Sequence, residues 1–275
     1  MVNIMATRMI LVTGANRGIG RRIVERLLLE SSDCRVLMTA RNAEQGEKAI
    51  SEIQALGHFE GRLLFHTLDL LSEQSIARLR DYIQSTTGPL DVLVNNAAVA
   101  WSGPEFTEEI ARFTLNTNFT ATIAITEALL PVLKPRAHIV MMSSYAGQLA
   151  RIPGEHLKAM LTAPTLTIDE VKTIAQRYLE SMAQGTAEAQ GWPRSTYIAS
   201  KNLLNAYIRL KSRELKDQPE RIRMNAVHPG WVRTDMGGPR APLSVDEGTE
   251  TPLAVIRDQS DVTGEFWDCS RITHW

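Results

Sequence analysis

Cysteine and excess charge are both scarce in this sequence. Only Cys34 and Cys269 occur in 275 residues, and the formal net charge is -1 at pH 7. Two distant cysteines supply neither a disulfide framework nor the ligand cluster of a tetrahedral zinc site, so we expect a cytoplasmic protein without metal. The balanced charge offers no electrostatic footprint for nucleic acid or an anionic membrane, and neither is expected as a partner.

Long apolar runs and linkers are missing as well. No uninterrupted apolar stretch could span a bilayer, and none with the character of a signal peptide precedes the first expected strand. The sequence has no internal repeat, no low-complexity tract and no Pro/Gly-rich linker that would divide it. With 44% hydrophobic and 22% charged residues, the composition is that of a globular protein. We therefore expect one domain over residues 1–275.

What the sequence does contain is a regular alternation of short apolar runs and helical patterns. The runs expected to be strands include 9–12, 35–39, 63–65, 92–94, 139–142 and 224–227. Such alternation predicts an α/β fold of the Rossmann type, a doubly wound parallel sheet of about seven strands with helices on both faces. Ligands of such folds bind at the carboxyl ends of the strands.

One long insertion, at about 148–190, interrupts this rhythm before Tyr197. Thr167 and Glu170 form a capping-box pattern, which predicts the start of a helix. The apolar residues that follow share one helical face: Ile168, Val171, Ala175, Tyr178, Leu179 and Met182. That face must be buried, so the helix is expected to pack on the body of the protein. A wall of the substrate site and a surface decoration are the two interpretations that remain open.

A glycine-rich turn follows the first expected strand and precedes a helical pattern. It reads Thr13-Gly14-Ala15-Asn16-Arg17-Gly18-Ile19-Gly20. Its glycines would let a pyrophosphate approach the main chain at the helix N-terminus, where unpaired N–H groups and the helix dipole favour an anion. The spacing departs from the usual Gly-x-Gly-x-x-Gly, and a plain structural turn stays an alternative. Its position between a strand and a helix favours dinucleotide binding.

The end of the second expected strand bears on the choice of nicotinamide cofactor. An NAD site usually places a carboxylate there, but this sequence has Arg41 and no acid. Arg41 and Arg17 together predict a clamp on a 2′-phosphate, because guanidinium groups match phosphate oxygens. NADPH is therefore expected rather than NADH, unless both arginines are ordinary solvated charges.

The chemistry is expected from a Tyr-x-x-x-Lys pair. Tyr197 and Lys201 lie on one face of an expected helix, and the ammonium, together with an oxidised nicotinamide, is expected to lower the pKa of the phenol. Ser144 follows the strand 139–142, where its hydroxyl could hydrogen-bond a substrate carbonyl. Asn118 lies within a long helical pattern and predicts a kink and a proton relay, although a polar helix residue is the plainer interpretation of it alone.

Taken together and in this order, the motifs resemble the short-chain dehydrogenase/reductase family. They are Thr13-Gly14-x-x-x-Gly18-x-Gly20, Asn95-Asn96-Ala97-Ala98, Ser144, Tyr197-x-x-x-Lys201 and Pro229-Gly230. The segments 191–197, 229–239 and 247–252, the insertion and Trp275 are similar to the monomeric, NADPH-dependent carbonyl reductases within that family. One departure is Ala98, which stands where the family usually has glycine.

The resemblance implies a role for each matching residue. It makes Tyr197 the acid, with Ser144, Lys201 and Asn118 completing the catalytic set. The cofactor residues that it implies are Gly14, Asn16, Arg17, Gly18, Ile19, Gly20, Arg41, Asp69, Leu70, Asn96, Ala97, Tyr197, Lys201, Pro229, Gly230, Val232 and Thr234. Substrate contacts are expected from Ser144, Tyr197, Trp101, Trp231 and Met236.

The activity expected from this set is reduction of small carbonyl compounds (aldehydes, ketones and quinones) by NADPH. A nucleotide-sensing protein without catalysis and an NAD-linked alcohol dehydrogenase on the same fold are the alternatives. The presence of Tyr197, Lys201 and Ser144 argues against the first, and Arg41 argues against the second. A monomer is also expected, because the insertion would cover the two long helices through which many members of the family associate.

Overall fold

One mixed sheet organises the protein in the computed structural model, which describes residues 7–101, 103 and 105–275. Its strands are β1 (Arg8–Val12), β2 (Cys34–Ala40), β3 (Leu63–Thr67), β4 (Leu90–Asn95), β5 (Leu133–Met142), β6 (Arg223–Val227), β7 (Phe266–Asp268) and β8 (Arg271–Thr273). Within the described residues they form one eight-stranded sheet in the order β3-β2-β1-β4-β5-β6-β7-β8. The Rossmann-type fold is confirmed.

The strand order places a ligand crevice between β1 and β4. β1 pairs in parallel with β2 on one side and with β4 on the other, so the chain winds in opposite directions from this point. Crevices of this kind lie outside the carboxyl ends of the strands. All pairs from β3 to β7 are parallel, whereas β8 returns antiparallel to β7. Neither β7 nor β8 was among the six runs expected to be strands, and three residues are too few to give a periodic signal.

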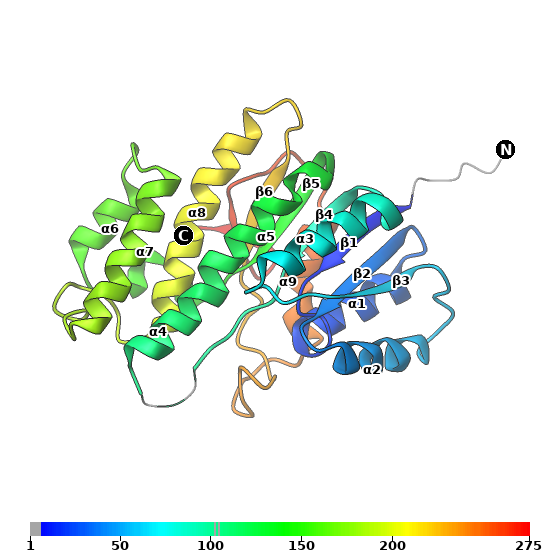
Figure 1. Cartoon of the computed structure of the whole chain (residues 1–275), viewed down its shortest axis with the longest axis horizontal. Coiled ribbons are helices and arrows are strands. Elements are labelled where there is room, and N and C mark those ends of the chain that lie inside the picture. Colours follow the sequence, from blue (N-terminus) through cyan, green and yellow to red (C-terminus); the bar gives the residue numbers. More distant parts are fainter. Residues whose placement is uncertain (1–6, 102, 104) are drawn as a thin grey trace.

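Helices cover both faces of the sheet (Figure 1). They are α1 (Gly18–Glu30), α2 (Ala43–Gln54), α3 (Glu73–Tyr82), α4 (Glu108–Leu115), α5 (Thr122–Leu129), α8 (Thr196–Lys216) and α9 (Glu247–Arg257). Successive residues of a strand point into the two hydrophobic cores on opposite faces of the sheet. Leu93 and Ile139 pack with residues of α3, α5 and α8, whereas Val92 and Val140 pack with residues of α1 and α9. The central strands β1, β4, β5 and β6 are thus largely buried on both sides, as continuous apolar runs predict.

The insertion folds into two helices, α6 (Glu155–Thr162) and α7 (Ile168–Ala183). The predicted capping box is present: Thr167 accepts a hydrogen bond from the Glu170 N–H, and the Glu170 carboxylate accepts one from the Thr167 N–H. Val171 and Tyr178 are fully buried. α7 contacts both α4 and α8, and α6 contacts α8, so the insertion lies over those two helices (Figure 1). α6 was not predicted.

Candidate active site

The glycine turn has the shape that close approach of a phosphate requires. Gly14 and Gly18 adopt left-handed backbone conformations, with φ of 61° and 58°. At Gly20 a Cβ atom would lie 2.3 Å from Asn96 Nδ2, so only glycine fits beside that amide. Asn96 in turn donates to the carbonyl oxygens of Thr13 (2.8 Å) and Gly14 (3.1 Å), which fixes the turn against the end of β4.

The start of α1 is open to an anion. Its N-cap, Arg17, provides no side-chain hydrogen bond, and the first turn contains no acidic residue. Most N-termini are capped by a side chain that occupies their unpaired N–H groups. Here those groups stay available at the crevice between β1 and β4, which fits a dinucleotide pyrophosphate. The structure places Gly14, Asn16, Gly18, Ile19 and Gly20 together at this crevice.

The segment after β4 tolerates the change from glycine to alanine. Thr13 Oγ1 accepts hydrogen bonds from the N–H groups of Asn96 (3.0 Å) and Ala97 (3.1 Å). Ala98 is not among the residues with positive φ. Alanine adopts negative φ as readily as glycine does, so the departure from the family pattern imposes no backbone strain here.

The expected adenosine side of the crevice is lined by the ends of β2 and β3. Arg41 follows β2 and is exposed, and Asn42 caps α2 by accepting from the Gln45 N–H. Asp69 and Leu70 follow β3 and are half-buried; the Asp69 carboxylate accepts from the Leu71 N–H at 3.0 Å. Arg41 has no carboxylate neighbour among the described ion pairs, which fits a 2′-phosphate.

Arg17, the second residue of the predicted clamp, has a partner that the sequence did not reveal. Its Nη1 lies 2.7 Å from Oδ2 of Asp235, and both side chains are largely exposed. Asp235 belongs to the segment after β6, so this ion pair bridges the two sides of the crevice. In the same segment Thr234 faces the glycine turn, because a Cβ atom at Gly18 would lie 3.5 Å from Thr234 Cγ2.

The rest of that segment is fixed by close packing. Gly230 adopts φ of 88°, and Pro229 beside it is half-buried. Val232 is buried, and a Cβ atom at Gly248 would lie only 2.4 Å from its Cγ2. Pro229, Gly230, Val232 and Thr234 thus follow β6 at the same sheet edge as the glycine turn, but the Val232 side chain packs inward on α9.

Tyr197 and Lys201 project from the first turns of α8, which Ser195 caps by accepting from the Ile198 N–H. The Lys201 ammonium is buried, donates to the Met142 carbonyl at the end of β5 (2.7 Å), and lies 5.7 Å from the centroid of the Tyr197 ring. Ser144, two residues beyond β5, hydrogen-bonds the Tyr197 side chain. The structure thus brings the three predicted residues together.

Burial dominates the acid–base properties of this group. It raises the pKa of Tyr197, and the Ser144 hydroxyl acts in the opposite direction. It also lowers the pKa of Lys201 to about 8. The lowering of the phenol pKa by Lys201 together with an oxidised nicotinamide therefore stays a prediction; in this structure the ammonium is directed at the Met142 carbonyl rather than at the phenol. A raised pKa keeps the phenol protonated, as a proton donor must be.

Asn118 lies where the long helix pattern is interrupted, as predicted. Residues Asn116–Ala121 form a π-helical turn between α4 and α5. The Asn118 side chain accepts from the Val99 N–H (2.8 Å) and donates to the Val99 carbonyl (2.8 Å) and to Ser200 Oγ (3.1 Å). The amide therefore ties the loop after β4 to α8.

Comparison with known proteins agrees with this geometry. Residues 8–156 match the short chain dehydrogenase family. The chain belongs to that family. Carbonyl reductase (NADPH) 1 of Sus scrofa is 37% identical over 98% of this chain and 94% of its own length, and that of Homo sapiens is 38% identical over 96% and 97%. The predicted family resemblance is confirmed.

Solved structures of the family share the fold over almost the whole chain. Salutaridine reductase from Papaver somniferum superposes with a TM-score of 0.86 at 27% identity, covering 95% of this chain and 100% of that one. The NADPH-bound carbonyl reductase from chicken fatty liver gives a TM-score of 0.71 at 27% identity, covering 98% and 99%.

Large apolar side chains lie exposed around this short-chain dehydrogenase site. The predicted substrate residues Trp101, Trp231 and Met236 follow β4 and β6, and all three are about half exposed. Trp101 Nε1 donates to Glu105 Oε2 at 2.9 Å, and Trp231 Nε1 donates to the Gly237 carbonyl at 2.8 Å. Tyr145 is exposed in the same way, but sequence reasoning missed it. Its position directly after Ser144 was the one sequence feature that could have indicated a place at the substrate site. Trp101, Tyr145, Trp231 and Met236 together form the apolar rim.

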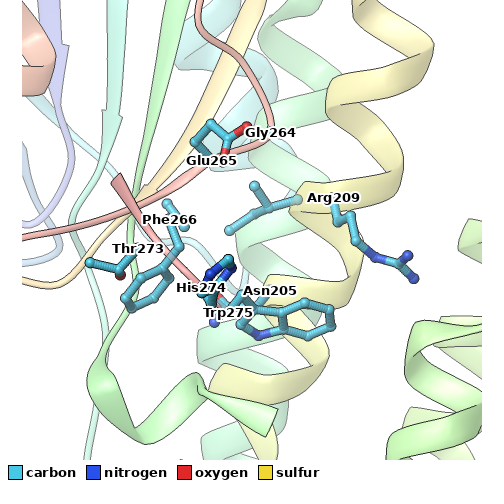
Figure 2. Close-up of a pocket in the computed structure, with 10 residues that line it drawn as sticks. Asn205, Arg209, Gly264, Glu265, Phe266, Thr273, His274 and Trp275 are labelled. Atoms are coloured by element: carbon cyan, nitrogen blue, oxygen red, sulfur yellow. The ribbon is translucent and has the colours of Figure 1, made fainter. Parts of the chain in front are cut away.

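A separate cavity of about 210 Å³ lies between α8 and the strands β7 and β8 (Figure 2). Asn205, Phe266, Thr273 and Trp275 are among its lining residues, whereas Tyr197 is not, so this cavity is not the catalytic site. Its walls nevertheless support that site. Trp275 Nε1 and Asn205 Nδ2 both donate to the Gly147 carbonyl, at 2.6 and 2.9 Å, and so hold the segment that follows Ser144.

Neither a metal cluster nor a membrane span is found in the described residues. No group of three or more His, Cys, Asp or Glu side chains could hold a metal ion there. No described helix is both long and apolar enough to cross a bilayer.

Proposed function

We propose that the protein reduces carbonyl compounds (aldehydes, ketones and quinones) to alcohols with NADPH. The observation that carries the proposal is the grouping of Ser144, Tyr197 and Lys201 beside a glycine turn whose helix N-terminus is open to an anion. The nicotinamide would supply a hydride to the carbonyl carbon. Relatives named carbonyl reductase (NADPH) support the same assignment.

The residues of the chain would complete the reaction around that hydride. The carbonyl oxygen would accept hydrogen bonds from Ser144 and Tyr197, and the phenol would pass its proton to the oxygen as the alkoxide forms. The buried Lys201 ammonium would stabilise the phenolate that remains, because an opposite charge offsets the burial of an anion. Its pKa of about 8 leaves it mostly charged at neutral pH.

Residues at the strand ends would hold the cofactor. The open start of α1 would bind the pyrophosphate, and Arg17 and Arg41 the 2′-phosphate. Asp69 and Leu70 would lie beside the adenine, Asn96 and Ala97 beside the ribose, and Pro229, Gly230, Val232 and Thr234 near the nicotinamide. The apolar rim would then enclose the substrate.

The test of this function is NADPH consumption with a panel of aldehydes, ketones and quinones. We expect turnover of several panel members, with alcohol formed in equal amount to the NADPH consumed. A nucleotide-sensing protein would bind NADPH without turnover of any panel member. An NAD-linked alcohol dehydrogenase would instead prefer NAD and alcohols, and either result would overturn the proposal.

We further propose that the protein is a cytoplasmic monomer. The free thiols of Cys34 and Cys269 suit a reducing compartment. α7 covers α4 and α8, the helices whose outer faces many family members use for association. Covering these faces within one chain removes the self-complementary patch that a two-fold dimer needs.

Light scattering over a wide concentration range tests the oligomeric state. We expect a constant mass near 30.6 kDa. Removing the insertion should expose the apolar faces of α4 and α8 and cause association or aggregation. A stable dimer of the intact chain would contradict the prediction, as would a soluble monomer lacking the insertion.

A further inference from the structure

Three side chains form a continuous stack beside Ser144. The guanidinium carbon of Arg151 lies 4.8 Å from the centroid of the Tyr145 ring. The Tyr145 ring lies 6.2 Å from the ring of His228, tilted by 41°. Tyr145 directly follows Ser144, and His228 directly precedes the Pro229-Gly230 segment. The stack therefore spans the ends of β5 and β6 at the proposed substrate site.

The charge of this stack comes from Arg151. None of the ion pairs within residues 7–101, 103 and 105–275 includes Arg151, and its side chain makes no hydrogen bond there either. Burial lowers the pKa of His228, with Asp268 opposing the shift, so the imidazole is mostly neutral near pH 7. Its Nδ1 accepts from the Gly230 N–H at 3.4 Å. A guanidinium without a carboxylate partner among the described ion pairs thus lies over Tyr145, a member of the apolar rim.

The tyrosine ring fixes the position of that guanidinium. A guanidinium over an aromatic face is attracted by the ring quadrupole, so Arg151 is restrained although its residue is exposed. Its planar N–H groups stay free to donate, and a carboxylate accepts two of them at once. A substrate whose carbonyl oxygen meets Ser144 would pass along the Tyr145 ring before it reaches Arg151.

We propose that the preferred substrates are carbonyl compounds that join an aromatic or apolar body to a carboxylate. The apolar rim contacts the body, and Arg151, held by Tyr145, binds the carboxylate. This inference rests on the proposed carbonyl reduction and adds the substrate class and the residue that determines it. Arg151 takes no part in hydride or proton transfer, so its contribution belongs to substrate binding.

The experiment compares matched acids and esters in the NADPH assay. The two acids are 4-carboxybenzaldehyde and 3-(4-formylphenyl)propanoate, which differ in the distance between the carbonyl and the carboxylate. Each acid is compared with its methyl ester. Arg151→Gln is expected to lower kcat/KM for at least one acid by about 5-fold, mainly through KM, and to leave the esters unchanged, since exposed charge pairs are worth little more. The acid effect should shrink as salt is added.

Further variants separate charge from fold. Arg151→Lys should restore part of the preference for the acid, and Tyr145→Ala should weaken it by releasing the guanidinium. Arg35→Gln is the matched control, because Arg35 lies at the amino end of β2, on the opposite edge of the sheet. This substitution should leave kcat/KM unchanged for both the acids and the esters.

The outcomes distinguish this inference from the proposed function. One outcome is that acids and esters are both reduced while Arg151→Gln changes kcat/KM equally for the acid and the ester of both pairs. In that case the proposed substrate class is wrong and carbonyl reduction stands. If wild-type protein reduces no member of either pair or of the wider panel, the proposed function fails and this inference fails with it.

Discussion

Tyr197→Phe is expected to lower kcat for carbonyl reduction by about 10²–10⁴-fold, the usual contribution of a positioned general acid. The substitution removes one oxygen atom and keeps the ring, so the packing of α8 should be preserved. NADPH binding should change little, because the glycine turn, the start of α1 and the two arginines are untouched.

The structure explains why no other group can easily replace this phenol. Ser144 hydrogen-bonds Tyr197, but its aliphatic hydroxyl is a much weaker acid than a phenol and therefore a poorer proton donor to the alkoxide. The Lys201 ammonium is already directed at the Met142 carbonyl, 2.7 Å away. Water could protonate the alkoxide slowly, which accounts for the residual rate that we expect.

Tyr178→Phe provides a matched control. Tyr178 is buried in α7, and its hydroxyl has no hydrogen-bond partner within the described residues. Its removal should leave kcat unchanged and should not lower stability. The measurements are single-turnover NADPH oxidation and NADPH affinity by fluorescence. Wild-type turnover by Tyr197→Phe, with the same pH dependence, would contradict the role of Tyr197.

Local sequence patterns were sufficient for most of the fold. The strands β1, β2, β4, β5 and β6 are largely buried on both faces, and such strands appear as short apolar runs, for example Ile10 to Val12. The capping box at Thr167 gave the start of α7 correctly. β7, β8 and α6 were not predicted, because three residues cannot show a period and because α6 has no side-chain cap and buries only Leu157 and Leu161.

The site was predictable where spacing along one element decides the geometry. Tyr197 and Lys201 are four residues apart on α8, and the glycine spacing fixes the turn before α1. Interactions between distant segments were not predictable. The pairing of Arg17 with Asp235, the direction of Lys201 toward Met142 and the stack of Arg151 on Tyr145 all depend on side-chain directions after folding.

Arg41→Asp is expected to reverse the cofactor preference from NADPH to NADH. A charge-assisted hydrogen bond to phosphate contributes about 1.5–3 kcal/mol, so loss of the Arg41 contact should weaken NADPH binding by about 10- to 100-fold. The new carboxylate would repel the 2′-phosphate and could accept hydrogen bonds from the ribose hydroxyls of NADH. The measurement is kcat/KM for each cofactor with one aldehyde, and NADH serves as the internal control for folding.

Substitution of Asp235 is expected to have the opposite effect on NADPH binding. Arg17 pairs with Asp235 in the structure, so Arg17 must leave or share that carboxylate in order to bind the 2′-phosphate. Exposed ion pairs are worth only about 0–1 kcal/mol, hence the exchange costs little. Asp235→Asn should therefore strengthen NADPH binding by a few-fold and leave NADH unchanged, whereas Arg17→Gln should weaken NADPH alone. Two results would show that Arg17 and Arg41 do not bind the phosphate and are ordinary surface charges. Either the wild type uses both cofactors equally well, or neither arginine variant changes NADPH binding more than NADH binding.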